Sequence, residues 1–202
     1  MAGFGFKTSW LAVRRGSVAA VADELGLVDR RPAGWADGTG EAYRRGVYVV
    51  SVCDDWTLAH GVQHLPGHGV DGSMDGFPEW LSAVSARLGE VQFFGSHRAV
   101  DYVAWALARG GTLERGYAYT GDDGVVLNVG EPTAIERELG IGVVPLDSWS
   151  DDEYDTWFRL AGDEEHVMQV AGAWSIDPHG LTEDDVRQPG VLGMPGDVGS
   201  YR

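Results

Sequence analysis

The sequence has very little of several residue types that carry covalent or metal chemistry in proteins. Cys53 is the only cysteine among 202 residues, so the chain cannot form an internal disulfide or a cysteine-rich zinc site. Such cysteine usage favours a reducing compartment. Lys7 is the only lysine and Asn128 the only asparagine. Because codons for both are AT-rich, this bias is typical of a high-GC bacterial genome and says nothing about function.

Long apolar runs are also missing. No stretch reaches 18 apolar residues, so the sequence predicts no membrane-spanning helix. Residues 1–15 lack the basic start and the apolar core of a secretory signal. We therefore expect a cytoplasmic protein.

Motifs of the common enzyme classes are absent. No glycine-rich dinucleotide fingerprint follows a strand, and neither a G-x-S-x-G elbow nor H-E-x-x-H occurs. The run at 5–8, GFKT, ends like a phosphate-binding loop, but Phe6 precedes the lysine and the spacing from Gly3 is wrong. Ser96 and His97 are neighbours on an expected strand, where side chains alternate between faces. We predict no catalytic residue and favour a protein that is not an enzyme.

Charge of one sign dominates. The chain has 31 acidic and 15 basic residues, a net charge of −16. Such a surface repels phosphate backbones and anionic lipids, so we expect no nucleic-acid or membrane partner. Residues 1–120 contain 13 acids and 11 bases, whereas residues 121–202 contain 18 acids and 4 bases. The excess therefore lies in the last part of the chain.

Apolar patterning predicts an α+β fold, with a mostly antiparallel sheet in a single globular domain over residues 1–202. Short apolar or β-branched runs indicate strands, and capping residues with helical periodicity indicate helices. The expected strands are 8–13, 47–52, 56–60, 90–95 and 125–129, and the expected helices are 18–26, 77–88, 134–139, 151–160 and 164–173. We expect loops over 29–46 and 61–76, and an irregular C-terminal arm over 187–202.

The secondary structure of residues 100–109 has two interpretations. Residues 100–109 are alanine-rich and could form a helix, but they also alternate with a period of two. Gly110-Gly111 is a hairpin signal before the alternating run 112–120. We favour a hairpin that continues as a meander to residue 129.

Two stretches, FKTSWLAVR at 6–14 and LERGYAYTGDDGVVLNVGEP at 113–132, resemble segments of uncharacterised bacterial proteins from high-GC species. In that group the second stretch looks like a hairpin followed by a Gly-Glu-Pro turn. The resemblance covers about a fifth of the chain and supports the hairpin. It implies no activity and no site residue.

Histidine spacing gives one candidate metal site. His60, His64 and His68 are four residues apart, and imidazole is a ligand for zinc, nickel and copper. The glycines and proline between them argue against a helix, so a site here would need a wrapping loop. The alternative is polar loop residues in solvent. A small metal-dependent or ligand-binding enzyme centred on the loop 54–76, with zinc as the possible metal, is our second functional hypothesis.

The acidic C-terminal half gives the first hypothesis. Acidic residues are concentrated there and aromatic residues lie among them, a composition that suits a docking face for a basic protein. An immunity or antitoxin-like protein that captures a basic effector is one concrete version. The alternative is a solubilising surface with ordinary core aromatics. The expected contact residues are Asp151, Asp152, Glu153, Tyr154, Asp155 and Trp157.

Overall fold

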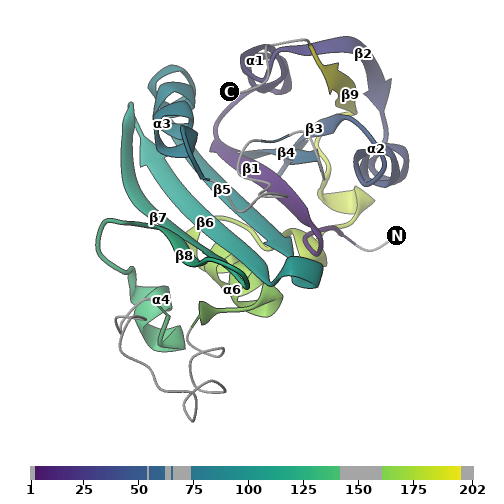
Figure 1. Cartoon of the computed structure of the whole chain (residues 1–202). Coiled ribbons are helices and arrows are strands. Elements are labelled where there is room, and N and C mark those ends of the chain that lie inside the picture. The colour runs from purple at the N-terminus through teal and green to yellow at the C-terminus, as the bar shows by residue number, and fades with distance from the viewer. Residues whose placement is uncertain (1–2, 54, 62–64, 66–73, 142–160, 197–202) are drawn as a thin grey trace.

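A computed structural model describes residues 3–53, 55–61, 65, 74–141 and 161–196. Within these residues nine antiparallel strands form one sheet, in the order β2-β9-β3-β4-β1-β5-β6-β7-β8 (Figure 1). The strands are β1 (Thr8–Arg14), β2 (Leu27–Ala33), β3 (Val47–Val52), β4 (Trp56–Gly61), β5 (Glu90–His97), β6 (Tyr102–Arg109), β7 (Thr112–Thr120), β8 (Gly124–Val129) and β9 (Gly190–Pro195).

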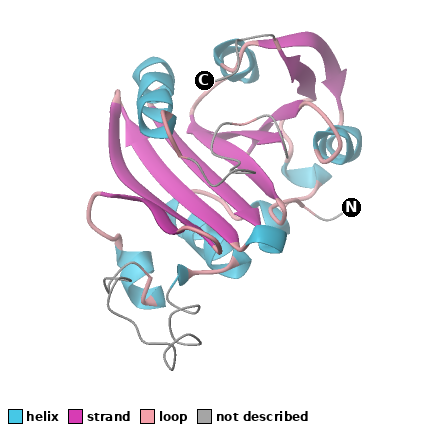
Figure 2. Ribbon diagram, in the orientation of Figure 1, coloured by secondary structure: helices cyan, strands magenta, loops and turns pink. Residues whose placement is uncertain are grey.

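Helices cover both faces of the sheet (Figure 2). They are α1 (Val18–Glu24), α2 (Trp35–Ala42), α3 (Phe77–Leu88), α4 (Ala134–Leu139) and α6 (Glu164–Trp174), with 3₁₀ turns η1 (Arg98–Val100), η4 (Pro178–Gly180) and η5 (Glu183–Asp185). Apolar side chains of α1 and α3 pack on one face, and those of α2, α4 and α6 pack on the other. The sheet is therefore the middle of three layers.

The sequence of β1 explains its central position. Trp10 and Ala12 pack on the α6 side, whereas Leu11 and Val13 pack on the α1 side. Because successive side chains of a strand face opposite ways, an unbroken apolar run is what a strand covered on both faces requires. Every residue from Thr8 to Val13 is buried.

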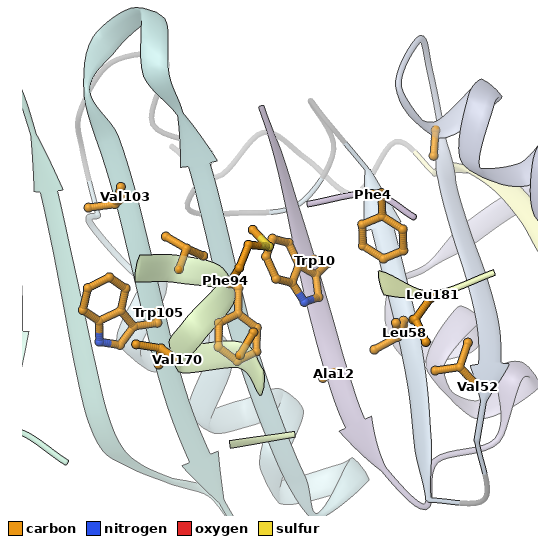
Figure 3. Packing of buried hydrophobic residues seen from close by; sticks show 14 of the residues in the cluster. Phe4, Trp10, Ala12, Val52, Leu58, Phe94, Val103, Trp105, Val170 and Leu181 are labelled. Atoms are coloured by element: carbon orange, nitrogen blue, oxygen red, sulfur yellow. The ribbon is translucent and has the colours of Figure 1, made fainter. Parts of the chain in front are cut away.

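A row of rings crosses the sheet on the α6 side. Each member is directly opposite the next on the neighbouring strand, and the row consists of Tyr48, His60, Trp10, Phe94, Trp105 and Tyr117. Figure 3 shows three of these rings, with Val170 of α6 against them. Trp10 stacks on Phe94 at 5.2 Å and Trp105 on Tyr117 at 4.8 Å between ring centroids. These large buried rings form the core on this face.

Most expected elements are present. The mostly antiparallel α+β sheet is confirmed, and residues 102–129 form the predicted three-stranded meander rather than a helix. Ser17, Thr133 and Asp163 are the N-cap residues of α1, α4 and α6, three of the helices expected from the sequence. The helix expected over 151–160 lies outside the described residues.

Two expectations were wrong. Residues 29–46 are not a loop, because β2 and α2 occupy Leu27–Ala33 and Trp35–Ala42. Pro32 is tolerated because β2 is an edge strand, and Gly38 of α2 allows the helix to pack closely on Tyr48. The segment 187–202 is not wholly an irregular arm, because residues 190–195 form β9 between β2 and β3. The pairing of β9 joins β2 to the sheet, a long-range contact with no local signal.

Candidate functional site

A cavity of about 620 Å³ lies at one end of the sheet. It is formed where β1 begins, where η1 leads from β5 into β6, and where α6 begins. Its lining residues are Phe6, Lys7, Arg98, Asp101, Tyr102, Val103, Gly162, Asp163, Glu164 and Glu165. The volume is within the range of small-molecule and side-chain binding pockets.

Hydrogen bonds hold the backbone of Lys7 at the cavity wall. Its N–H lies 3.3 Å from Ser96 Oγ and 3.2 Å from Glu164 Oε1. The buried Ser96 hydroxyl is also within 3.2 Å of the Gly5 carbonyl and 3.1 Å of Glu164 Oε1, the two acceptors for its proton. Glu164 therefore joins the first turn of α6 to the start of β1.

Backbone strain concentrates at this cavity. Lys7 has a φ of 53° and Asp101 a φ of 46°, both in the left-handed region that non-glycine residues rarely adopt. Strained residues of this kind often occur at functional sites, where the surrounding structure holds them in place. Here both strained residues are charged, and both line the same cavity.

Carboxylates surround the cavity. Asp163, Glu164 and Glu165 come from the start of α6, and Asp101 follows η1. Asp163 caps α6 by accepting the His166 N–H at 3.0 Å. The Glu165 and Asp101 side chains belong to exposed residues and make no hydrogen bond or ion pair to any other described residue. They are free to bind a ligand.

Two cations share the cavity with these acids. Lys7 and Arg98 are exposed, and neither side chain makes an ion pair with another residue that the structure describes. Arg98 begins η1, directly after β5, and Lys7 directly precedes β1, the neighbour of β5. As far as the described residues go, the cavity therefore offers unpaired charges of both signs.

Tyr102, Val103 and Gly162 are the buried residues of the cavity lining, and Tyr102 is the one that can ionise. Its side chain is 1% exposed, and burial raises the pKa of its phenol well above the usual value. The phenol is therefore neutral at physiological pH. Its ring belongs to the core cluster on the α1 and α3 side of the sheet, the face opposite α6.

Acidic residues extend beyond the cavity along the same end of the sheet. The turn that joins β7 to β8 carries Asp122 and Asp123, and Gly121 of that turn donates its N–H to the Val100 carbonyl at 3.2 Å. We call the resulting surface the acidic end. It consists of Asp101, Asp122, Asp123, Asp163, Glu164 and Glu165.

The histidines of the metal hypothesis are only partly described. His60 is buried within the ring row, where it stacks on Phe4 at 4.1 Å and meets the Tyr43 ring edge at 4.8 Å. Burial lowers the pKa of His60 to about 3. His64 and His68 lie outside the described residues. Among the residues that are described, no three His, Cys, Asp or Glu side chains form a group that could hold a metal ion.

The six residues expected at the docking face, Asp151, Asp152, Glu153, Tyr154, Asp155 and Trp157, also lie outside the described residues. The cavity residues Arg98, Asp101 and Glu165 were not singled out from the sequence. They come from segments far apart in the chain, so only the strand register brings them together. Lys7 was noted in the sequence as the one lysine of the chain, but no function was assigned to it.

No helix in the described part of the chain has the length and apolar character needed to cross a membrane.

Residues 74–170 match the model of a family of unknown function, DUF6928. The matched region contains α3, the strands β5 to β8, α4 and most of α6. No curated protein and no solved structure matches the chain. The match is consistent with the expected resemblance to an uncharacterised family.

Proposed function

We propose that this chain is a non-enzymatic binding protein that captures a basic protein partner at the acidic end. One observation carries the proposal: four carboxylates from two separate elements surround the cavity of about 620 Å³. A pocket with acidic walls fits the side chain of a partner's arginine or lysine.

The surrounding charge supports the same partner. Asp122 and Asp123 extend the acidic end beyond the cavity, and both are exposed. In the sequence, eight residues separate the acidic run at 151–155 from the start of α6 at Glu164. A concentrated negative field of this kind speeds the capture of a positively charged protein and rejects acidic ones. An immunity or antitoxin-like protein, which must capture a basic effector quickly, is the version of this function that we favour.

The test compares two variants of equal net charge. Asp101→Asn with Glu165→Gln removes two carboxylates from the cavity, whereas Asp29→Asn with Glu79→Gln removes two exposed carboxylates elsewhere. Each purified protein is immobilised, and a lysate of the source organism is passed over it at low and at high salt. Asparagine tolerates the left-handed backbone at both positions 29 and 101.

We expect the unmodified protein and the control variant to retain the same basic protein at low salt and to release it at high salt. The cavity variant should retain much less of it. Equal retention by both variants would contradict the proposed site, because the binding would then follow net charge alone. Retention of no basic protein by the unmodified chain would contradict the function itself.

A further inference from the structure

The cavity holds a second feature that a simple acidic docking pocket does not need. Besides its carboxylates, it presents Lys7 and Arg98, which have no ion-pair partner among the described residues. A ligand with only positive charge would leave these two cations without a counter-charge. Charges of both signs that have no partner among the described residues fit a ligand that also carries both signs.

We propose that the cavity binds the C-terminal residue of a basic polypeptide, a terminal arginine or lysine with its free carboxylate. This inference rests on the proposed function and specifies which part of the partner enters the cavity. The terminal carboxylate binds Lys7 and Arg98, and the basic side chain binds the carboxylates of Asp101 and Glu165. Capture of a C-terminal carboxylate is a known mode of peptide recognition.

The positions of the charged residues fit such a ligand. Lys7 and Arg98 stand at the rim of the sheet, where β1 starts and β5 ends on neighbouring strands. Glu165 comes from the first turn of α6, on the other wall. Glu164 is already engaged by Ser96 and the Lys7 backbone, so Glu165 is the free acid of that turn.

The size of the cavity favours a chain end over a free amino acid. A volume of about 620 Å³ is in the range that holds drug-sized ligands, which are larger than a single amino acid. The terminal residue and the residues before it would fill this space.

The test uses short synthetic peptides and isothermal titration calorimetry with the full chain. The main probe is N-acetylated Gly-Gly-Arg with a free carboxylate. The first comparison is the same peptide with a C-terminal amide, the second is N-acetylated Gly-Gly-Gln with a free carboxylate, and the third is free arginine. Lys7→Gln with Arg98→Gln removes the two cations, and Arg44→Gln with Arg45→Gln is the charge-matched control on exposed arginines.

We expect the free-acid arginine peptide to bind at least about tenfold more tightly than its amide. Only the free acid has a carboxylate that can form charged hydrogen bonds with Lys7 and Arg98. The Lys7/Arg98 variant should bind both peptides equally, whereas the control variant should keep the difference. The glutamine peptide should bind weakly, and so should free arginine. The thermal unfolding midpoint of each variant confirms that it is folded.

Three results would overturn the inference. Equal binding of acid and amide would show that the carboxylate is not recognised, and the basic-partner function would still stand on its own test. Free arginine that binds as tightly as the peptide would assign the cavity to a small molecule. No peptide binding by a chain that still captures a basic protein from lysate would place the contact elsewhere on that partner.

Discussion

Arg115 and Glu136 form an ion pair that solvent does not reach. Arg115 Nη2 lies 2.6 Å from Glu136 Oε1, and the two side chains are 2% and 0% exposed. Burial alone raises the pKa of Glu136, but hydrogen bonds from Arg115, the Thr133 N–H and the Trp105 ring outweigh it and hold that pKa below its usual value. The carboxylate is therefore ionised and almost fully hydrogen-bonded inside the protein.

The same arginine fixes the turn after β8. Arg115 Nη1 donates to Asn128 Oδ1 at 2.8 Å and to the carbonyls of Val129 and Gly130 at 2.9 and 3.1 Å. These contacts join β7, the Gly-Glu-Pro turn and α4. They give a structural reason for the pattern LERGYAYTGDDGVVLNVGEP, whose arginine, asparagine and glycine all belong to this network.

Replacing Arg115 by Met should lower the free energy of unfolding by about 3–5 kcal/mol, because Glu136 would remain buried without its counter-charge. Urea denaturation at neutral pH measures the loss. Arg109→Met is the matched control, since Arg109 pairs with Glu90 and Glu114 on the surface and its side chain is 46% exposed. That change should cost at most about 1 kcal/mol. An equal loss of unfolding free energy in the two variants would show that the buried pair contributes no more to stability than the surface pair.

Much of the fold could be predicted from local sequence. The strands and capped helices with regular apolar periods, such as β3 and α3, were found because their signals lie within a few residues. α2 was missed because its sequence, WADGTGEA, has two glycines and weak helix propensity. Tertiary packing of Trp35, which is 1% exposed, overrides that propensity.

The candidate site was largely beyond sequence reasoning. Arg98, Asp101 and Glu165 belong to an unremarkable loop and a helix start, and they meet only because β5 lies between β1 and β6. The position of β9 was missed for the same reason. Its partners β2 and β3 are more than a hundred residues away, and no local pattern encodes that pairing.

His60 should make the stability of the protein fall as the pH falls below neutral. An unfolded histidine takes up a proton near pH 6.5, whereas burial lowers the pKa of folded His60 to about 3. Between these values the unfolded chain binds more protons, so the free energy of unfolding decreases with falling pH by up to about 1.4 kcal/mol per unit. Above pH 6.5 this contribution is complete and constant.

His60→Phe tests this assignment, because a phenyl ring can stack on Phe4 without a titrating group. Urea denaturation of both proteins at several pH values from 7.5 to 5 (about the range in which carboxylates stay ionised) isolates the histidine. The difference in stability between the two proteins should change steadily below pH 6.5 and stay level above it. A difference independent of pH throughout would rule out His60 as the source.

Gly38 and Gly40 of α2 should respond in opposite directions to the same substitution. A Cβ at Gly38 would lie 2.3 Å from the ring of Tyr48, which is 0% exposed, whereas a Cβ at Gly40 has no atom within 4 Å. Alanine favours a helix by about 0.5–1 kcal/mol over glycine, so Gly40→Ala should stabilise the protein by about that amount. Gly38→Ala gains the same propensity but must displace a buried ring, so it should lower the free energy of unfolding by about 1–3 kcal/mol. Chemical denaturation of the two variants measures both changes, and stabilisation by Gly38→Ala would mean that α2 does not pack on Tyr48 as closely as described.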